Sequence, residues 1–471
     1  MAPCKPVKVI EQCTVAPPPG SVPVPVADIP LTFFDQLWLP LPPPQTLHFY
    51  DYPYPSSIII QSLIPLIKLS LSCTLTHFYP LAGKLSWPHD SYRPIIRYED
   101  GDSVSVTVVE SDADFDFLTS DHPRDVTESH PLVPYLQSSG PIVPVLAIQI
   151  TVFPNFGLSI GMTNNHSIMD GRAVAHFMKI WASISKYGDV TKSVLTQSLP
   201  FLDRSMIKEP AGIEKKYLNQ LETFMGAEFV SGNRSLRVMD IEIQPDIVRA
   251  TMELNPTDLR RLKDWILARQ NKVGQPGPTH TSTYVVSCAF AWVCLLKAEE
   301  AAIEHKPGNN KIHTKTSFWV NVDCRARMKM DPPIPGTYFG NCVKHFLVTT
   351  ERSNLLKEDG IIVASQLIGE GIRRLDKGVL SGLEDAISNL LGMESVKICA
   401  VAGSPRSGLY GVDYGWGRPK KVEFVSNDRT GAMFVKESPK LDGGIEIDFA
   451  LNKKEMDAFV PLFNGLSFMF D

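Results

Sequence analysis

The clearest change of hydrophobic pattern along the chain lies between residues 158 and 184. Leu158, Ile160 and Met162 alternate with smaller or polar residues, and this spacing predicts a β-strand. After residue 170, apolar side chains recur at steps of three and four, which predicts one buried face of a helix. These side chains are Val174, Phe177, Met178, Trp181 and Ile184. His166 therefore falls between a strand and a helix, where its side chain can point into a cleft while both elements hold its backbone.

The same two periods predict further elements in the first half of the chain. A helix is predicted for residues 56–75, with a kink at Pro65. The acidic run at residues 112–116 is interpreted as a solvated helix start, because no ligand-spaced glycine loop follows it. Strands are predicted near residues 5–15, 95–96, 104–109 and 143–152.

The pattern weakens between residues 191 and 233, where proline, glycine and charged residues interrupt it. This segment is predicted to be a crossover linker between an N-terminal lobe, residues 1–190, and a C-terminal lobe, residues 234–471. In the second lobe, strands are predicted at residues 238–243, 318–325, 422–425, 431–435 and 443–451, and helices at residues 257–267, 281–296 and 453–462.

Length and composition narrow the classes of protein. A chain of 471 residues is long for a single core, so two domains are expected. The net charge of -5 gives no basic field for nucleic acid. Residues 1–26 have no continuous apolar run typical of a secretory signal, and residues 58–71 are predicted to be too short and interrupted to span a membrane. The eight cysteines form no CxxC pair, which favours reduced thiols in the cytoplasm.

Two interpretations of His166 compete. It is either a loop histidine with a locally bonded ring or a general base, since an unperturbed imidazole titrates near neutral pH. Asp170 also has a structural interpretation, because Asp directly before a helix is a favoured N-cap. The pattern His-x-x-x-Asp-Gly is short and occurs by chance in many proteins. The choice therefore depends on the rest of the chain.

Three other blocks accompany this pattern. They are DYGWG at residues 413–417, YFGNC at residues 338–342, and LTHFYPLAGKL at residues 75–85. Together the four blocks resemble the plant BAHD acyltransferases, which move an acyl group from coenzyme A to an alcohol or amine. Tyr414 stands where the family usually has Phe. The resemblance runs from the N-terminus to about Phe463, and the YFGNC block with residues 401–406 looks most like the branch that acylates anthocyanins and other phenolic glycosides.

The resemblance implies a fold and a division of roles. The implied fold is α/β, with two similar lobes of mixed β-sheet and covering helices, like chloramphenicol acetyltransferase, joined by a long crossover. Asp170 is expected to pair with Arg325 and to shape the loop that aims His166. The family's DFGWG block supports the coenzyme channel away from the reacting atoms; the matching residues here are Asp413, Gly415, Trp416 and Gly417. Acyl-CoA is expected as a co-substrate, with no permanently bound cofactor or metal, and the protein as a monomer that binds neither nucleic acid nor membrane.

The expected mechanism uses His166 to take the proton of the acceptor hydroxyl as it attacks the thioester. Trp416 or Asn341 is considered as a donor to the oxyanion or as part of the wall. The helix start at Ser282 and Thr283 either binds a phosphate of coenzyme A or is only capped by a hydroxyl.

The expected substrates are malonyl-CoA and a hydroxyl of a phenolic, flavonoid or anthocyanin glycoside. Arg172 or Arg406 is considered as the partner of the malonyl carboxylate, and each has an internal ion pair as its alternative. A hydroxycinnamoyl donor with an O- or N-acceptor is the second choice. A non-catalytic binding protein of the same fold is a further alternative. A metal hydrolase is disfavoured, because no second histidine lies one helical turn from His166.

Overall fold

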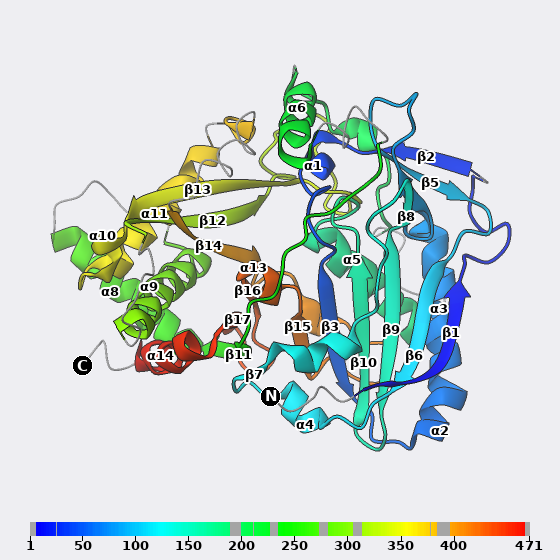
Figure 1. Cartoon of the computed structure of the whole chain (residues 1–471), viewed down its shortest axis with the longest axis horizontal. Coiled ribbons are helices and arrows are strands. Elements are labelled where there is room, and N and C mark those ends of the chain that lie inside the picture. Colours follow the sequence, from blue (N-terminus) through cyan, green and yellow to red (C-terminus); the bar gives the residue numbers. More distant parts are fainter. Residues whose placement is uncertain are drawn as a thin grey trace.

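The chain folds into two lobes, each built on a mixed β-sheet with helices packed against it (Figure 1). The predicted α/β two-lobe fold is therefore confirmed. The computed structural model describes residues 6–24, 26–188, 199–210, 212–226, 234–272, 281–304, 313–376, 378–383 and 396–466, with side chains left out at 270–272 and 304.

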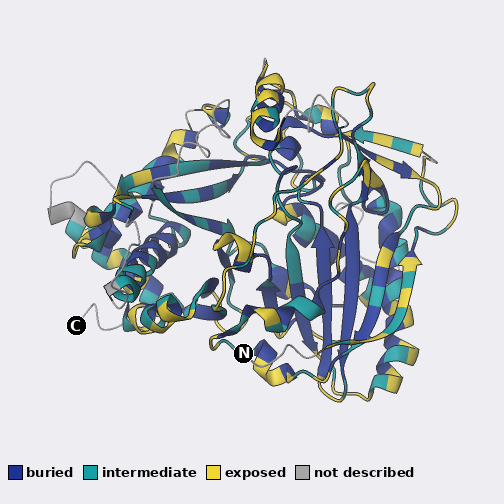
Figure 2. Cartoon of the chain, in the orientation of Figure 1, coloured by how far each residue is buried: buried dark blue, intermediate teal, exposed yellow. Residues whose placement is uncertain are grey.

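The N-terminal lobe is organised on a six-stranded sheet in the order β1-β6-β9-β10-β3-β15. Every residue of β9 and β10 is buried, and these strands are dark along their whole length in Figure 2. Helices α3 and α5 pack together with the sheet in one large hydrophobic cluster. The bounds are β1 (Lys8–Val15), β3 (Gln45–Asp51), β6 (Val104–Glu110), β9 (Leu146–Phe153), β10 (Gly157–Asn164), β15 (Lys421–Phe424), α3 (Ile64–His77) and α5 (Gly171–Tyr187).

A smaller antiparallel sheet of four strands, in the order β2-β5-β4-β8, completes this lobe. The predicted strand at residues 143–152 is divided between β8 and β9. The acidic run is a helix start as predicted, since the Asp114 carboxylate accepts the Phe117 amide at 3.0 Å. The bounds are β2 (Val26–Pro30), β4 (Lys84–Ser86), β5 (Ile95–Glu99), β8 (Ile142–Pro144), α1 (Phe33–Gln36), α4 (Phe115–Thr119), η2 (Tyr79–Leu81) and η3 (Val126–Leu132).

The helical stretch Ser56–His77 has a local change of winding before Pro65. It runs through α2 (Ser56–Ile58), a π-helical turn η1 (Ile59–Leu63) and α3, and proline lies in the first turn of α3, where its missing N–H is tolerated. Its 22 residues are long and apolar enough to cross a membrane, so the prediction that this segment is too short is wrong. In this structure, 44% of its most apolar window is buried inside the fold.

The C-terminal lobe has a seven-stranded sheet in the order β13-β12-β14-β16-β17-β11-β7. Residues 238–243 were expected to form its first strand, but they lie outside any strand, and β11 begins at Ile247. The bounds are β7 (Arg124–Asp125), β11 (Ile247–Leu254), β12 (Lys315–Asp323), β13 (Val343–Glu351), β14 (Val396–Gly403), β16 (Met433–Glu437), β17 (Ile445–Asn452), α8 (Pro256–Lys272), α9 (Thr283–Glu304), α10 (Arg352–Leu356), α11 (Gly360–Leu375), α13 (Asn427–Thr430), α14 (Lys453–Asn464) and η7 (Leu409–Gly411).

Each lobe lends a strand to the other. β15, from the second half of the chain, pairs antiparallel with β3, and β7, from the first half, pairs with β11. The predicted crossover at residues 191–233 lies partly outside the described residues. Its described parts contain η5 (Arg204–Met206) and α6 (Ile213–Met225), and the buried face of α6 joins two hydrophobic clusters.

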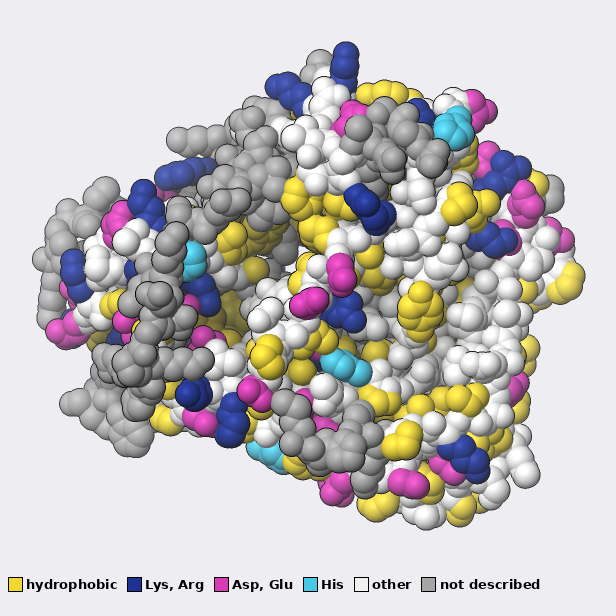
Figure 3. Space-filling view, viewed as in Figure 1, with side chains coloured by type: hydrophobic (Ala, Val, Ile, Leu, Met, Phe, Trp, Pro, Cys, Tyr) yellow, Lys and Arg dark blue, Asp and Glu magenta, His cyan; other side chains and the backbone are white. Residues whose placement is uncertain are grey.

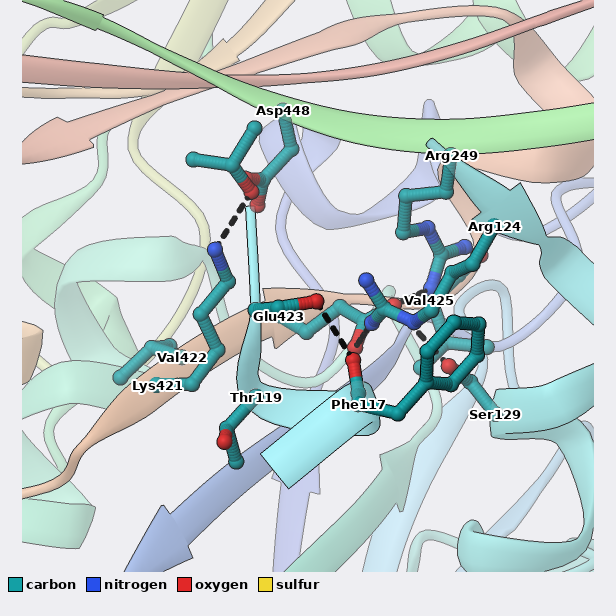
Figure 4. A network of polar contacts seen from close by, with 12 residues as sticks. Phe117, Thr119, Arg124, Ser129, Arg249, Lys421, Val422, Glu423, Val425 and Asp448 are labelled. Atoms are coloured by element: carbon teal, nitrogen blue, oxygen red, sulfur yellow. Dashed lines mark hydrogen bonds and ion pairs between the residues drawn. The ribbon is translucent and has the colours of Figure 1, made fainter. Parts of the chain in front are cut away.

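The exchanged strands meet in a buried ionic network. Glu423 on β15 accepts hydrogen bonds from Arg124 of β7 at 2.6 Å and from Ser129 at 3.0 Å, and also from Arg249 of β11. All three charged side chains are 1% exposed. Figure 4 shows Glu423 flanked by the two guanidinium groups. This carboxylate therefore joins the two sheets.

Replacing Glu423 with Gln is expected to cost about 2 kcal/mol of stability at neutral pH, since hydrogen bonds to charged groups contribute about 1.5–3 kcal/mol. Burial raises the pKa of Glu423, but Arg124 and Arg249 outweigh it and lower this pKa to about 2. Because the unfolded value is near about 4.3, the ionised form stabilises the fold fully above that pH. This contribution is lost as the pH falls toward about 2. Urea unfolding at pH 7 and pH 3.5 should show the difference between wild type and variant shrinking. An equal difference at both pH values would contradict the assignment.

Candidate active site

His166 lies in the turn between β10 and α5, as the hydrophobic pattern predicts. The turn is closed locally, because the Asn165 side-chain oxygen accepts both the Ser167 amide and its hydroxyl, at 3.0 and 2.7 Å. The His166 ring is partly exposed, but its Nδ1 is buried and has no hydrogen-bond partner among the described residues. The other nitrogen, Nε2, is not among the buried atoms without a partner.

Asp170 points away from His166 and is fully engaged elsewhere. Its carboxylate accepts a forked pair of hydrogen bonds from Arg325, at 2.8 and 3.1 Å, and one from the Cys342 amide at 3.0 Å. It also caps α5 by accepting the Ala173 amide at 3.0 Å. The ion pair implied by the family resemblance is thus present, and the capping interpretation holds as well. Asp170 ties the start of α5 to the C-terminal lobe.

A second buried carboxylate, Asp35, holds the other side of the histidine turn. It accepts hydrogen bonds from Arg204 at 2.8 Å and from both the backbone and side-chain amides of Asn341, at 2.9 and 3.0 Å. Asn341 and Arg204 then donate to backbone carbonyls of the turn, at His166 (2.9 Å) and Ile168 (2.7 Å). Both side-chain N–H groups of Asn341 are used in this way. Asn341 therefore supports the turn, while donation to an oxyanion or binding of substrate by Asn341 stays a prediction.

Trp38 lies face to face with His166. The two ring centroids are 4.0 Å apart and the planes differ by 6°. Burial in this apolar setting lowers the pKa of His166, and the negative charge of Asp170 opposes this shift in part. A lowered pKa keeps the imidazole neutral at physiological pH, the form that can accept a proton.

The DYGWG block forms a rigid turn far from His166. Asp413 accepts the amides of Gly415 and Gly417 at 2.8 and 3.0 Å and binds Lys186, at the end of α5, at 2.6 Å. At about 1.5 Å per helical residue, the sixteen residues from Asp170 to Lys186 separate the two ends by roughly 24 Å. Trp416 in this turn stacks on Tyr414. The turn therefore lies at the opposite end of α5, too far from the reacting atoms for Trp416 to serve as an oxyanion donor.

The four residues expected to bind anions have different environments. Arg172 forms an ion pair with Asp323 at 2.8 Å and donates to the Gly336 carbonyl at 3.0 Å, so its internal-pair alternative is observed. Arg406 is exposed and makes no ion pair with the described residues. Ser282 accepts a hydrogen bond from the Val285 amide at 3.3 Å, which is plain capping of α9 beside Thr283.

The hollow between the lobes exposes hydrophobic side chains on the face drawn in Figure 3.

Three residues of the site were assigned no role from the sequence: Asp35, Trp38 and Arg204. A signal existed for Asp35, because Thr32 and Asp35 have the spacing of a capping box, and that box is present before α1. No local pattern marks Trp38 or Arg204, since each acts through contacts with distant segments.

Comparison with known proteins places this arrangement in a family. The model described as the Transferase family matches residues 5–464. The chain is 37% identical to phenolic glucoside malonyltransferase 1 of Nicotiana tabacum, over 98% of this chain and 99% of that protein. It is 36% identical to coumaroyl-CoA:anthocyanidin 3-O-glucoside-6''-O-coumaroyltransferase 1 of Arabidopsis thaliana, over 97% and 96%. The crystal structure of vinorine synthase superposes with a TM-score of 0.67 at 18% identity, over 98% of each chain. The chain therefore belongs to this family, that of the BAHD acyltransferases, and is an acyltransferase that uses acyl-CoA as its co-substrate.

Proposed function

We propose that this enzyme transfers a malonyl group from malonyl-CoA to a hydroxyl of a phenolic, flavonoid or anthocyanin glycoside, with His166 as the general base. The observation that carries the mechanism is the partly exposed His166 ring, whose Nδ1 is buried without a hydrogen-bond partner among the described residues, which leaves Nε2 for the acceptor. The substrate class is supported by the relatives, which act on a phenolic glucoside and an anthocyanidin glucoside.

The reaction needs one proton to move and one charge to be stabilised. Nε2 of His166 accepts the hydroxyl proton while the acceptor oxygen attacks the thioester carbonyl, which becomes a tetrahedral oxyanion. The oxyanion collapses and expels the coenzyme A thiolate, which recovers the proton from the His166 imidazolium. No nucleophilic serine or cysteine is required. The buried thiols of Cys324 and Cys342, beside the Asp170–Arg325 pair, have pKa values raised by burial, which keeps them protonated.

The malonyl carboxylate requires a fixed cation in a partly dry cleft. Arg172 lies closer to His166, in the first turn of α5, but a malonyl group would have to share it with Asp323. Arg406 has no such competitor, and its turn touches α5 at Lys179, which donates to the Ser407 carbonyl at 2.9 Å. That contact lies roughly 13 Å along α5 from Asp170.

We expect malonyl-CoA to give a higher kcat/KM than acetyl- or coumaroyl-CoA with a panel of phenolic glycosides, followed by release of free thiol. If Arg172 or Arg406 meets the malonyl carboxylate, its change to Ala should weaken malonyl-CoA about tenfold or more relative to acetyl-CoA. Arg374→Ala, on an exposed helix surface, is the matched control. A preference for coumaroyl-CoA that neither variant alters would overturn the malonyl choice and favour the coumaroyl alternative.

One other function remains as an outcome of the same assay. Transfer from hydroxycinnamoyl-CoA to an amine acceptor would indicate an N-acyltransferase. We also propose a monomer in the cytoplasm. The seven cysteines that the structure describes are free thiols, which supports a reducing compartment. Size-exclusion chromatography and cell fractionation test these two proposals.

A further inference from the structure

In the described part of the chain, no carboxylate forms a hydrogen bond to the His166 ring that stacks on Trp38. Asp170 and Asp35 are the carboxylates that hold the histidine turn, and their partners are Arg325 and Arg204. The two carboxylates accept hydrogen bonds from these two guanidinium groups and from backbone amides. Nδ1 of His166 has no hydrogen-bond partner in the described part of the chain. Among the described residues no carboxylate hydrogen-bonds to the imidazole, and Asp170 favours the imidazolium only through its charge.

The indole of Trp38 covers one face of the same ring. Its plane is within 6° of the imidazole plane at a centroid distance of 4.0 Å, so a delocalised positive charge on His166 would lie over the π system. Aromatic faces carry negative potential, and tryptophan is the strongest of them for a cation, more so in a desolvated site. The indole N–H is buried without a hydrogen-bond partner among the described residues, so packing fixes this ring. The backbone N–H of Trp38 donates to the Asp35 carbonyl at 3.1 Å, which links the indole to the network under the histidine turn.

We propose that Trp38 is a positioning residue for the acyl transfer: its indole face holds the His166 ring in one orientation and stabilises the imidazolium as it forms. This inference rests on the proposed role of His166 as the base. It does not depend on which acyl group is transferred, because the proton moves to the same nitrogen for every donor. The proposal assigns two different roles around His166. The ion pairs hold the backbone of the turn, and the indole of Trp38 holds the imidazole ring.

Two substitutions separate the π face from simple bulk. Trp38→Leu keeps an apolar side chain against His166 and removes the aromatic face, whereas Trp38→Phe keeps a weaker face. Trp319→Leu is the matched control, because Trp319 stacks on His345 in the C-terminal lobe at 3.9 Å and 20°.

We expect kcat to fall in the order wild type, Trp38→Phe, Trp38→Leu, with a loss of about 5- to 30-fold for Leu and an almost unchanged KM for acyl-CoA. Loss of the π face destabilises the imidazolium and lowers the pKa of His166. The acidic limb of the kcat–pH profile should therefore move to lower pH in Trp38→Leu, with Phe between, and stay in place in Trp319→Leu.

Three results would overturn the proposal. They are an unmoved acidic limb in Trp38→Leu, a limb that moves to higher pH, and a defect confined to KM, which would indicate substrate contact instead. If Trp38→Leu fails to fold, the Phe variant carries the same test. Near-normal turnover in His166→Ala would instead refute the base itself, so the two failures are distinguishable.

Discussion

Replacing His166 with Ala is expected to lower kcat by about 10²–10⁴-fold, the usual contribution of a positioned general base. The loss should appear in kcat and leave coenzyme A binding nearly intact, since Nε2 acts on the acceptor proton and no coenzyme contact is assigned to this ring. The histidine turn should keep its shape, because its hydrogen bonds run through the backbone carbonyls of His166 and Ile168 and the side chain of Asn165.

The measurement is steady-state turnover together with coenzyme A binding by calorimetry, and circular dichroism to check the fold. His122→Ala is the matched control, because His122 is exposed and its ring contacts Ser120 and Phe117, both close to it in the sequence. Near-normal turnover in His166→Ala, with the fold intact, would rule out a general base at this position.

Replacing Arg325 with Met is expected to destabilise the protein by about 3–5 kcal/mol, the cost of leaving one member of a buried ion pair uncompensated. Both partners are 2% exposed, so Asp170 would retain a charge without its main partner. The backbone carbonyls of Tyr338 and Gly340, which Arg325 also binds at 3.2 Å, would lose a donor. Activity should fall with stability, because the start of α5 loses its ion pair to the second lobe and keeps only the Cys342 amide at Asp170.

A double-mutant cycle with Asp170→Asn isolates the pair, since Asn keeps an oxygen for the N-cap and removes the charge. Asp457→Asn, which removes an exposed i, i+4 pair with Lys453, is the control and should change stability by less than about 0.5 kcal/mol. If Arg325→Met unfolds at the same urea concentration as wild type, the pair contributes no net stability, and its proposed role in shaping the turn fails.

Elements with a strong local pattern were predictable from the sequence. β10, the His166 turn and α5 follow directly from the change of period, because one buried strand and one amphipathic helix leave little choice for the turn between them. The failure at residues 238–243 has a tertiary cause. Their alternation resembles that of a strand, but pairing requires a partner edge, and β17 takes β11 at that edge.

Contacts between distant segments were not predictable from residue spacing. The Asp170–Arg325 pair joins residues 155 apart and was expected only through the family resemblance. The network of Asp35, Arg204 and Asn341 brings three separate segments together, and only the tertiary fold reveals that Asn341 donates inward to the turn. The stack of Trp38 on His166 has the same character, since aromatic packing leaves no periodic trace in either segment.

The strand that the second lobe lends to the first also sets the order of events during synthesis. One edge of β3 cannot pair until β15 has been synthesised. Next to this pairing, the Gln45 amide donates a hydrogen bond to the hydroxyl of Ser426, which lies 381 residues further along the chain. At about 5–20 residues per second, a ribosome needs roughly 20 to 75 s to make that intervening chain. During this interval one edge of β3 has no partner strand, although most of its residues are buried in the folded protein. Such an exposed edge can pair with the wrong strand. Nascent chains stalled before residue 421 should therefore aggregate or recruit chaperones. The yield of heterologous expression should depend more on conditions that slow aggregation than on the stability of the folded enzyme.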